Sequence, residues 1–264
     1  MTTDSPLRGR SILVTRERSQ AGALSRLLAA KGASPLECPL IALSPPPDWG
    51  PVDAALARLR EYDGILFTSA NAVRFFAQRL RATGTPLDLV RQVPGFAIGP
   101  ATARALADEG FPAQAIADLG QAEGVMALLA KGKLAGKRFL FPRAREAREV
   151  LPRFLEERGA RADLVVVYET RTAHENRPLL WHILKSENLD YLTFTSTSTV
   201  TAFGLMMAAV GSPEPSWRAI PAACIGEITA QAARGLGFPR VLAATAPTVQ
   251  SLVQTITDYD RKGA

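Results

Sequence analysis

Short apolar runs alternate with longer amphipathic segments along this chain of 264 residues. Each apolar run has the length and composition of a buried strand, and each segment after it repeats its apolar residues at helical spacing. The clearest case is residues 63–73, where Ile65 to Phe67 are followed by a Thr-Ser pair and a helical pattern that begins at Val73. Strands that alternate with helices predict parallel sheets covered by helices on both faces.

The pattern occurs twice. An offset of 127 residues (143 − 16) aligns Arg16 with Arg143, residues 63–73 with 190–200, and Ile98-Gly99 with Ile225-Gly226. A constant offset over a whole chain indicates a duplicated unit, and this period is far too long for a solenoid. We therefore predict two flavodoxin-like α/β domains with doubly wound parallel sheets.

The elements are predicted at the same offset in both copies. Strands are expected near Ile12–Thr15, Leu36–Ala42, Ile65–Thr68, Gly95–Ile98, Gln114–Ala117, Phe139–Phe141, Leu164–Tyr168, Leu192–Thr195, Ala222–Ile225 and Val241–Ala243. Helices of the first copy are expected near Ala21–Lys31, Val52–Arg60, Ala72–Arg81, Ala101–Glu109 and Glu123–Ala130.

The second strand of each copy is long, and we interpret residues 34–43 and 162–172 as connectors between domains. Pro35 and Pro39 in the first of them argue against a central strand, because proline cannot donate to a sheet ladder. Two connectors make the middle of the chain one domain and its two ends the other. The predicted domains are residues 1–36 with 171–264, and residues 40–168.

The charge balance suits an anionic partner. Lys and Arg outnumber Asp and Glu by 31 to 25, for a net charge of +6, but the basic residues are spread along the chain. A basic solvated surface explains this equally well, and a nucleic-acid arm is not indicated. Cys38 and Cys224 have no partners at metal-ligand spacing and are expected to be buried thiols. Without an apolar leader or membrane-length segment, we expect a cytoplasmic protein.

Four strand-to-helix turns are candidate anion sites: the Thr-Ser turns at Ser69 and Ser196 and the Ile-Gly turns at Gly99 and Gly226. A helix that begins there directs unpaired N–H groups and the positive end of its dipole outward. One such turn is most often an ordinary connection. Four of them, paired by a duplication, favour a ligand with several negative charges held between two domains.

Few side chains are candidates for chemistry. Arg16 and Arg143, each just past a first strand, either bind carboxylates or are solvated loop arginines. His174 and His182 are best explained as solvated, and no phosphate-binding loop or nucleophile triad is found. The Tyr168 phenol is protonated at neutral pH and is able to donate a proton. From the residues alone, packing is the better explanation of Tyr168.

Six motifs together resemble the uroporphyrinogen-III synthase family over almost the full chain. They are Leu13-Val-Thr-Arg16, residues 63–73, Ile98-Gly-Pro-Ala-Thr-Ala103, Val167-Tyr-Glu-Thr170, Ile225-Gly-Glu-Ile-Thr-Ala230 and Pro247-Thr-Val-Gln-Ser-Leu252. The resemblance implies a lyase with two domains on a two-stranded connector, acting without a metal or organic cofactor. We expect the protein to be a monomer. Its substrate would be hydroxymethylbilane, a linear tetrapyrrole polycarboxylate that loses water and closes to uroporphyrinogen III with its last ring inverted through a spiro intermediate.

The resemblance also implies roles for residues. Tyr168 becomes the general acid, and substrate is bound in the interdomain cleft largely through main-chain N–H groups. Glu227 departs from the family pattern and stands where the first copy has Pro100. A carboxylate at this position would repel an anionic substrate. The implied substrate-binding residues are Ser69, Asn71, Ala72, Gly99, Ala101, Thr102, Ser196, Ser198, Thr199, Ile228, Thr229 and Val249.

Two other functions are compatible with the same features. A cytosolic two-domain anion sensor without catalysis would need the same helix N-termini. An enzyme acting on phosphate esters or sugars is disfavoured by the lack of a phosphate loop, metal cluster or carboxylate pair in the sequence.

Overall fold

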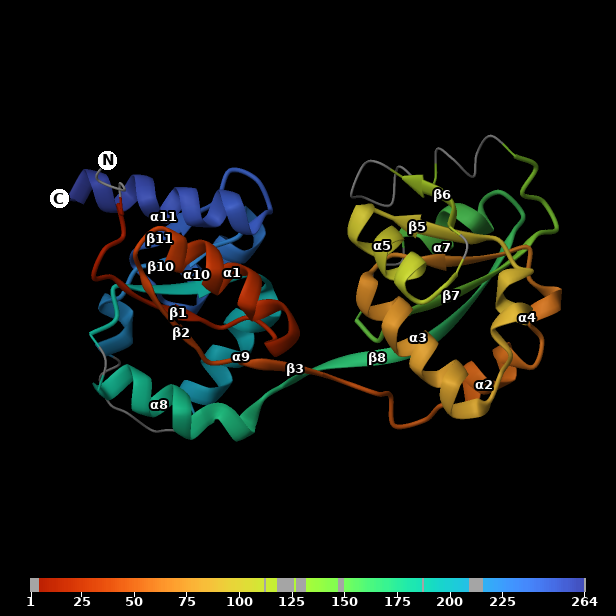
Figure 1. The fold of residues 1–264 in the computed structure, drawn as a ribbon, viewed down its shortest axis with the longest axis horizontal. Coiled ribbons are helices and arrows are strands. Elements are labelled where there is room, and N and C mark those ends of the chain that lie inside the picture. Colours follow the sequence, from red (N-terminus) through yellow and green to blue (C-terminus); the bar gives the residue numbers. More distant parts are fainter. Residues whose placement is uncertain are drawn as a thin grey trace. The chain divides into compact units, whose positions relative to one another are not determined.

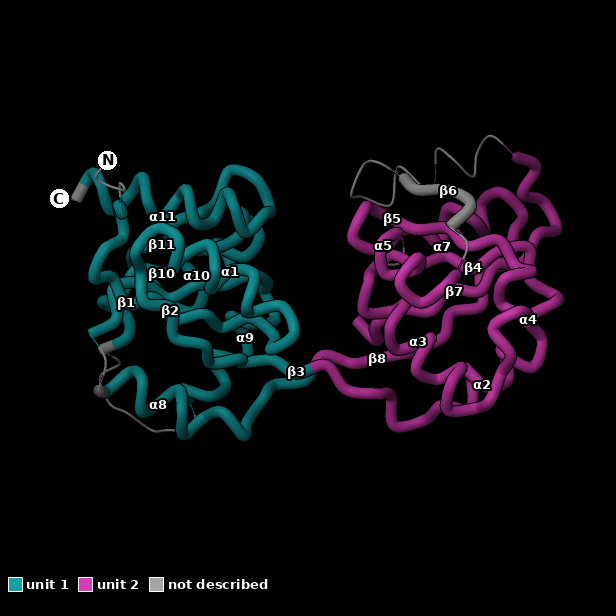
Figure 2. The backbone as a smooth tube through the Cα atoms, viewed as in Figure 1, with its two compact units in different colours: residues 1–42, 171–264 teal, residues 43–170 magenta. Residues whose placement is uncertain are grey.

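The computed structural model divides the chain into two compact units, residues 1–42 with 171–264 and residues 43–170 (Figure 2). The chain passes between them within β3 (Ile41–Ser44) and β8 (Arg161–Thr172), which are neighbouring strands of one sheet. Both units are α/β with mostly parallel sheets, as the sequence predicts (Figure 1). The structure describes residues 5–111, 113–117, 126, 132–146, 150–186, 188–208 and 216–263.

The first unit has the strand order β11-β10-β9-β1-β2, with parallel neighbours throughout. Because side chains alternate along a strand, Ile12 and Val14 face a core formed with α1 and α11, while Leu13 faces one formed with α8, α9 and α10. The elements are β1 (Ser11–Val14), α1 (Arg18–Ala30), β2 (Ser34–Glu37), η2 (His174–Asn176), α8 (Arg177–Ser186), β9 (Tyr191–Phe194), α9 (Thr197–Ala208), η3 (Ser216–Ala219), β10 (Ala222–Cys224), α10 (Glu227–Leu236), β11 (Val241–Ala243) and α11 (Val249–Gly263).

The second unit has the order β3-β8-β7-β4-β5-β6. Helices α2, α3 and α5 pack on one core of its sheet, and α7 packs on another that contains Phe139 and Phe141. The predicted helix at 123–130 lies outside the described residues except for Met126. The elements are α2 (Gly50–Leu56), η1 (Leu59–Glu61), β4 (Gly64–Phe67), α3 (Ala70–Thr83), α4 (Leu87–Arg91), β5 (Gly95–Ile98), α5 (Pro100–Asp108), β6 (Ala113–Ala117), β7 (Arg138–Ala144) and α7 (Val150–Glu156).

Each sheet combines strands from both copies of the repeat. The first unit joins β1 and β2 of the first copy to β9, β10 and β11 of the second. The sheet of the second unit joins β3, β4, β5 and β6 of the first copy to β7 and β8 of the second. Strands related by the 127-residue offset thus occupy equivalent places, but neither copy forms a sheet by itself.

An aspartate joins the two copies inside each sheet. Asp190, just before β9, accepts the main-chain N–H of Ser11 at 2.8 Å and pairs with Arg10 at 2.9 Å. Its own N–H donates to the Ser11 carbonyl at 2.9 Å. These bonds hold the start of β1 against the start of β9.

The equivalent residue of the second unit, Asp63, makes the same contacts. Its carboxylate accepts the main-chain N–H of Arg138 at 2.9 Å and pairs with Lys137 at 2.6 Å, and its N–H donates to the Arg138 carbonyl at 2.8 Å. The hydrogen bond from Lys137, followed by that from the Arg138 amide, lowers the pKa of Asp63 below its usual value. The ionised carboxylate is therefore the form that the fold stabilises.

The long strand predicted at 36–42 is two strands, β2 and β3, with Cys38 to Leu40 between them. The N–H groups of Cys38 and Leu40 still donate to the Val14 and Thr15 carbonyls at the end of β1, but Pro39 has no N–H to continue a ladder. Pro35 is tolerated because β2 is an edge strand of its sheet.

The predicted thiols are buried. Cys38 and Cys224 have no exposed surface, and burial raises the pKa of Cys38 to about 11 and that of Cys224 to about 12. Neither thiol is therefore ionised at neutral pH. Among the described helices, none is both long and apolar enough to span a membrane.

The Asp63 contacts predict a pH-dependent stability. Asp63→Asn should lower the free energy of unfolding at pH 7 by about 1 kcal/mol, since the ion pair is lost. Because the folded-state pKa of Asp63 is lowered, its stabilisation is complete above the ordinary aspartate pKa of about 3.9 and is lost as the pH falls through the folded-state value. Urea titrations of both proteins from pH 7 to pH 3 should therefore show a shrinking difference. Asp88→Asn, with a side chain 83% exposed, is the control and should change stability by under about 0.5 kcal/mol.

The close packing around Gly64, the first residue of β4, predicts a second effect on stability. A Cβ on Gly64 would lie 2.6 Å from the Phe96 ring and 3.1 Å from the Phe139 ring. Gly64→Ala should therefore destabilise the protein by about 1–3 kcal/mol through overpacking. Gly22→Ala, the same change in α1 with nothing within 4 Å, should stabilise it by about 0.5–1 kcal/mol. Equal effects in a denaturant titration would contradict the packing argument.

Candidate functional site

The four predicted turns lie at the carboxyl edges of the two sheets, two in each unit. Parallel strands end at one edge, so the helices that follow begin there. In the second unit the turns after β4 and β5 lead into α3 and α5, and in the first unit the turns after β9 and β10 lead into α9 and α10. Each unit therefore has its own edge of helix N-termini.

The two Thr-Ser turns are capped by the protein's own side chains. Ser69 Oγ accepts the Ala72 N–H at 3.1 Å, and Ser196 Oγ accepts the Thr199 N–H at 3.3 Å. Thr199 Oγ1 also donates to the Ser196 carbonyl at 2.7 Å. The amides of Ala72 and Thr199 are thus occupied, which reduces what these turns offer to an anion.

The two Ile-Gly turns have no side-chain cap. Neither Gly99 nor Gly226 makes a capping hydrogen bond. Gly99 has φ 80°, a left-handed conformation that favours glycine. Helix geometry leaves the first amides after each glycine without an intrahelical acceptor. The residues with such amides include Ala101 and Thr102 after Gly99, and Ile228 and Thr229 after Gly226.

The side chains around these amides differ in exposure. Ile228 is 67% exposed, whereas Thr229 and Thr102 are buried. Glu227, the departure noted in the sequence, pairs with Arg234 at 2.6 Å, and this hydrogen bond lowers the Glu227 pKa. Arg234 lies two turns further along α10, so the carboxylate has a cation beside it.

Tyr168 lies on β8 beside the capped turn of the second unit. Its hydroxyl is 3.3 Å from Ser69 Oγ, and its ring stacks on Phe75 with centroids 5.4 Å apart and planes 18° apart. The β7–β8 register pairs it with Ala144, the last residue of β7, which places it at the carboxyl edge. Tyr168 is 8% exposed, so its ring is packed in the core, as the residues alone suggest. Its hydroxyl lies beside the Ser69 turn.

The two arginines occupy different surroundings. Arg16 follows β1, is half-buried and donates to the Gln20 side chain at 2.7 and 3.0 Å. Burial lowers the pKa of Arg16, partly opposed by Glu17. Arg143 is inside β7 rather than in a loop, is 5% exposed and lies 5.8 Å from the Phe141 ring.

The other candidates lie on the same edges. Asn71 is half-buried in the first turn of α3, Ser198 is exposed in the first turn of α9, and Val249 begins α11. His174 and His182 are exposed, as predicted. No group of three or more His, Cys, Asp or Glu in the described parts of the chain is placed to hold a metal ion.

The predicted residues therefore form two groups. The second unit brings together Ser69, Asn71, Ala72, Gly99, Ala101, Thr102, Arg143 and Tyr168, and the first unit has Arg16, Ser196, Ser198, Thr199, Ile228, Thr229 and Val249. Sequence reasoning missed Phe75, which stacks on Tyr168, and Gln20, which holds Arg16. Gln20 lies four residues after Arg16, a helical spacing that offers a local signal. Phe75 has none, because its partner is remote in sequence.

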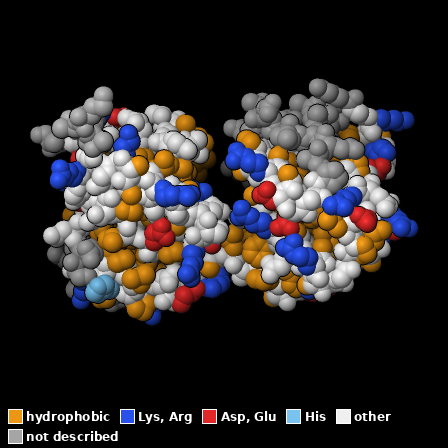
Figure 3. Space-filling model, in the orientation of Figure 1, with side chains coloured by type: hydrophobic (Ala, Val, Ile, Leu, Met, Phe, Trp, Pro, Cys, Tyr) orange, Lys and Arg blue, Asp and Glu red, His pale blue; other side chains and the backbone are white. Residues whose placement is uncertain are grey.

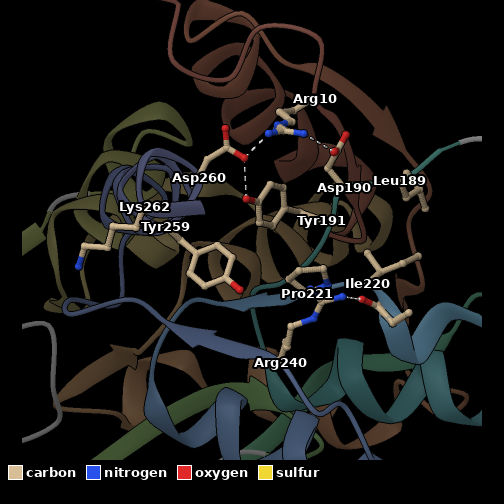
Figure 4. A pocket seen from close by; sticks show the side chains of 11 residues that line it. Arg10, Leu189, Asp190, Tyr191, Ile220, Pro221, Arg240, Tyr259, Asp260 and Lys262 are labelled. Carbon is tan, nitrogen blue, oxygen red and sulfur yellow. Dashed lines mark hydrogen bonds and ion pairs between the residues drawn. The ribbon is translucent and has the colours of Figure 1, made fainter. Parts of the chain in front are cut away.

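Two cavities of the described residues lie elsewhere, at the amino edges of the sheets. One, of about 630 Å³, has Arg10 between Asp190 and Asp260, with Tyr191 donating to Asp260 at 2.8 Å (Figure 4). The other, of about 440 Å³, is lined by residues that include Tyr62 and Arg138. Neither contains a predicted site residue. On the face drawn in Figure 3, Lys and Arg side chains are scattered over both units.

Known proteins resemble this chain over most of its length. The uroporphyrinogen-III synthase of Synechococcus elongatus is 33% identical over 207 residues, which cover 78% of each chain. That of Chlorobaculum parvum is 30% identical over 231 residues, covering 87% of this chain and 90% of the relative. The crystal structure of uroporphyrinogen-III synthetase from Helicobacter pylori has the same fold, with a TM-score of 0.62, 22% identity and coverage of 95% of this chain and 99% of that one.

A family model, described as uroporphyrinogen-III synthase HemD, matches residues 22–254. The match includes five of the six motifs in full. It covers both copies of the repeat and leaves out only the two ends of the chain. The resemblance inferred from the sequence is confirmed by these matches. The chain belongs to the uroporphyrinogen-III synthase family.

Proposed function

We propose that the protein converts hydroxymethylbilane into uroporphyrinogen III, with loss of water and inversion of the last ring. The observation that carries the proposal is the pair of uncapped turns at Gly99 and Gly226, one in each unit of a chain of this family. A carboxylate bound there gains main-chain hydrogen bonds and the positive end of a helix dipole. The eight carboxylates of the bilane are enough to use both turns and the cation of Arg16.

Restraint of the substrate is the main chemical task. Loss of the hydroxyl leaves an electrophilic ring that would otherwise close the simple way round. Carboxylates held by fixed amides make the terminal ring attack through its substituted carbon, and the resulting spiro intermediate reopens and closes inverted. This task needs few acid-base groups, in keeping with the few candidates in the sequence.

Tyr168 is the proposed general acid. Its proton goes to the leaving hydroxyl as the carbon–oxygen bond breaks, so that water departs with the bonding electron pair and a phenolate remains. The ring carbon that closes the macrocycle later loses a proton, which restores the phenol. The place of Tyr168 at the carboxyl edge, 3.3 Å from Ser69 Oγ, supports this role.

We also propose that the protein works in the cytoplasm as a monomer, with its two units as domains and connectors near residues 34–43 and 162–172. Both units have cores of their own, which supports this division. The interdomain cleft and the absence of a cofactor stay predictions.

The isomer of the product tests the proposal. Purified protein should convert freshly made hydroxymethylbilane mainly to the type III isomer, resolved by chromatography after oxidation. Only the type I isomer, as in the protein-free control, would contradict synthase activity and favour the anion sensor. Binding of the bilane without turnover would identify that alternative.

Removing the phenol should slow the reaction. Tyr168→Phe is expected to lower kcat by about 10²–10³-fold, because the general acid is lost while the ring still stacks on Phe75. The midpoint of thermal unfolding should change little, which is checked by calorimetry. An unchanged kcat would remove Tyr168 from the mechanism.

Arg16 should affect substrate binding. Arg16→Gln is expected to raise KM about tenfold, since a half-buried cation that pairs with a carboxylate contributes about 1.4 kcal/mol or more. Arg26→Gln makes the same charge change at an exposed position of α1 and is the control. Equal values of KM for the two variants would show that Arg16 acts only through net charge.

A further inference from the structure

Ser69 contacts two groups at once. Its Oγ accepts the Ala72 N–H at 3.1 Å, as the cap of α3, and lies 3.3 Å from the Tyr168 hydroxyl. Ser69 is half-buried and Tyr168 is 8% exposed, and both lie at the carboxyl edge of the sheet. Phe75, from the second turn of the same helix, stacks on the Tyr168 ring. One helix therefore holds both the ring and the hydroxyl of this tyrosine.

The direction of the Ser69–Tyr168 hydrogen bond follows from the chemistry. Either hydroxyl is able to donate in the resting protein. When Tyr168 gives its proton to the leaving hydroxyl, its oxygen becomes an acceptor only. Ser69 must then donate, and it is able to do so because the Ala72 N–H uses one of its lone pairs and not its proton.

We propose that Ser69 is a positioning residue that donates a hydrogen bond to Tyr168 and stabilises the phenolate formed when water leaves. This role rests on the proposed function and replaces the substrate contact expected from the family resemblance. The Ala72 N–H polarises the Ser69 hydroxyl and strengthens it as a donor. Ser69 thereby connects the positive end of α3 to the oxygen on which negative charge develops.

The test removes the hydroxyl while keeping the helix. Ser69→Gly is the main variant, because glycine at an N-cap costs only a few tenths of a kcal/mol, and Ser69→Ala is the second. Ser69→Thr keeps both the cap and the donor. Each variant is made alone and with Tyr168→Phe, and kcat, KM and thermal midpoint are measured with hydroxymethylbilane.

We expect Ser69→Gly and Ser69→Ala to lower kcat on the order of tenfold, with KM within twofold. The effect is smaller than the loss of an oxyanion-hole donor, because a hydrogen bond to a phenolate contributes less than one to an oxyanion-hole intermediate. Ser69→Thr should restore most of kcat. In the Tyr168→Phe background, loss of the Ser69 hydroxyl should change nothing further, because the group on which it acts is gone.

Three results would overturn the inference while leaving the proposed function intact. They are an unchanged kcat in Ser69→Gly, a loss confined to KM, and an equal loss of kcat with or without Tyr168→Phe, which would mean that Ser69 acts directly on substrate. Failure of the proposed function has a different sign, namely only the type I isomer from the unaltered protein. Full turnover in Tyr168→Phe alone would remove the general acid on which the inference rests, without contradicting synthase activity.

Discussion

The bonds of Asp63 and Asp190 to the main chain of the neighbouring strand join the two copies of the repeated sequence. Each aspartate precedes the third strand of one copy and binds the amide at the start of the first strand of the other. An ionised carboxylate that bonds a backbone N–H and a cation is worth more than a surface ion pair, because the amide is also satisfied. Both sheets, and the edges that end them, depend on this pairing of strands from distant parts of the chain.

Pairing in parallel places all the strand-to-helix turns of a unit on one edge. That arrangement creates helix N-termini, but it does not by itself create anion sites, since Ser69 and Ser196 each already bind one amide of their own helix. The glycines at 99 and 226 have no side chain with which to do so. The duplication therefore supplies each unit with one Thr-Ser turn that has a side-chain cap and one Ile-Gly turn that has none.

Two charged groups of the first unit bear on how its carboxyl edge receives an anion. Glu227 would repel a carboxylate, but Arg234 pairs with it. Arg16 has lost part of its hydration and has a neutral amide oxygen, from Gln20, as its hydrogen-bond acceptor. A cation with a neutral partner gains more from an incoming carboxylate than one already paired, because no ion pair must first be broken.

The sequence alone determined the fold class. Strand and helix periods, and an offset repeated over the whole chain, are patterns of the sequence itself that any tertiary arrangement must keep. β5 and β11 have the bounds predicted for them. It also indicated the four turns and Tyr168, through motifs that lie within a few residues. Only the tertiary structure decided which turns are capped, that Arg143 belongs to β7, and that Ser69 and Phe75 contact Tyr168. The contacts with Tyr168 join residues about a hundred positions apart. The caps are local, but whether a hydrogen bond forms depends on atomic distance, which no periodicity records.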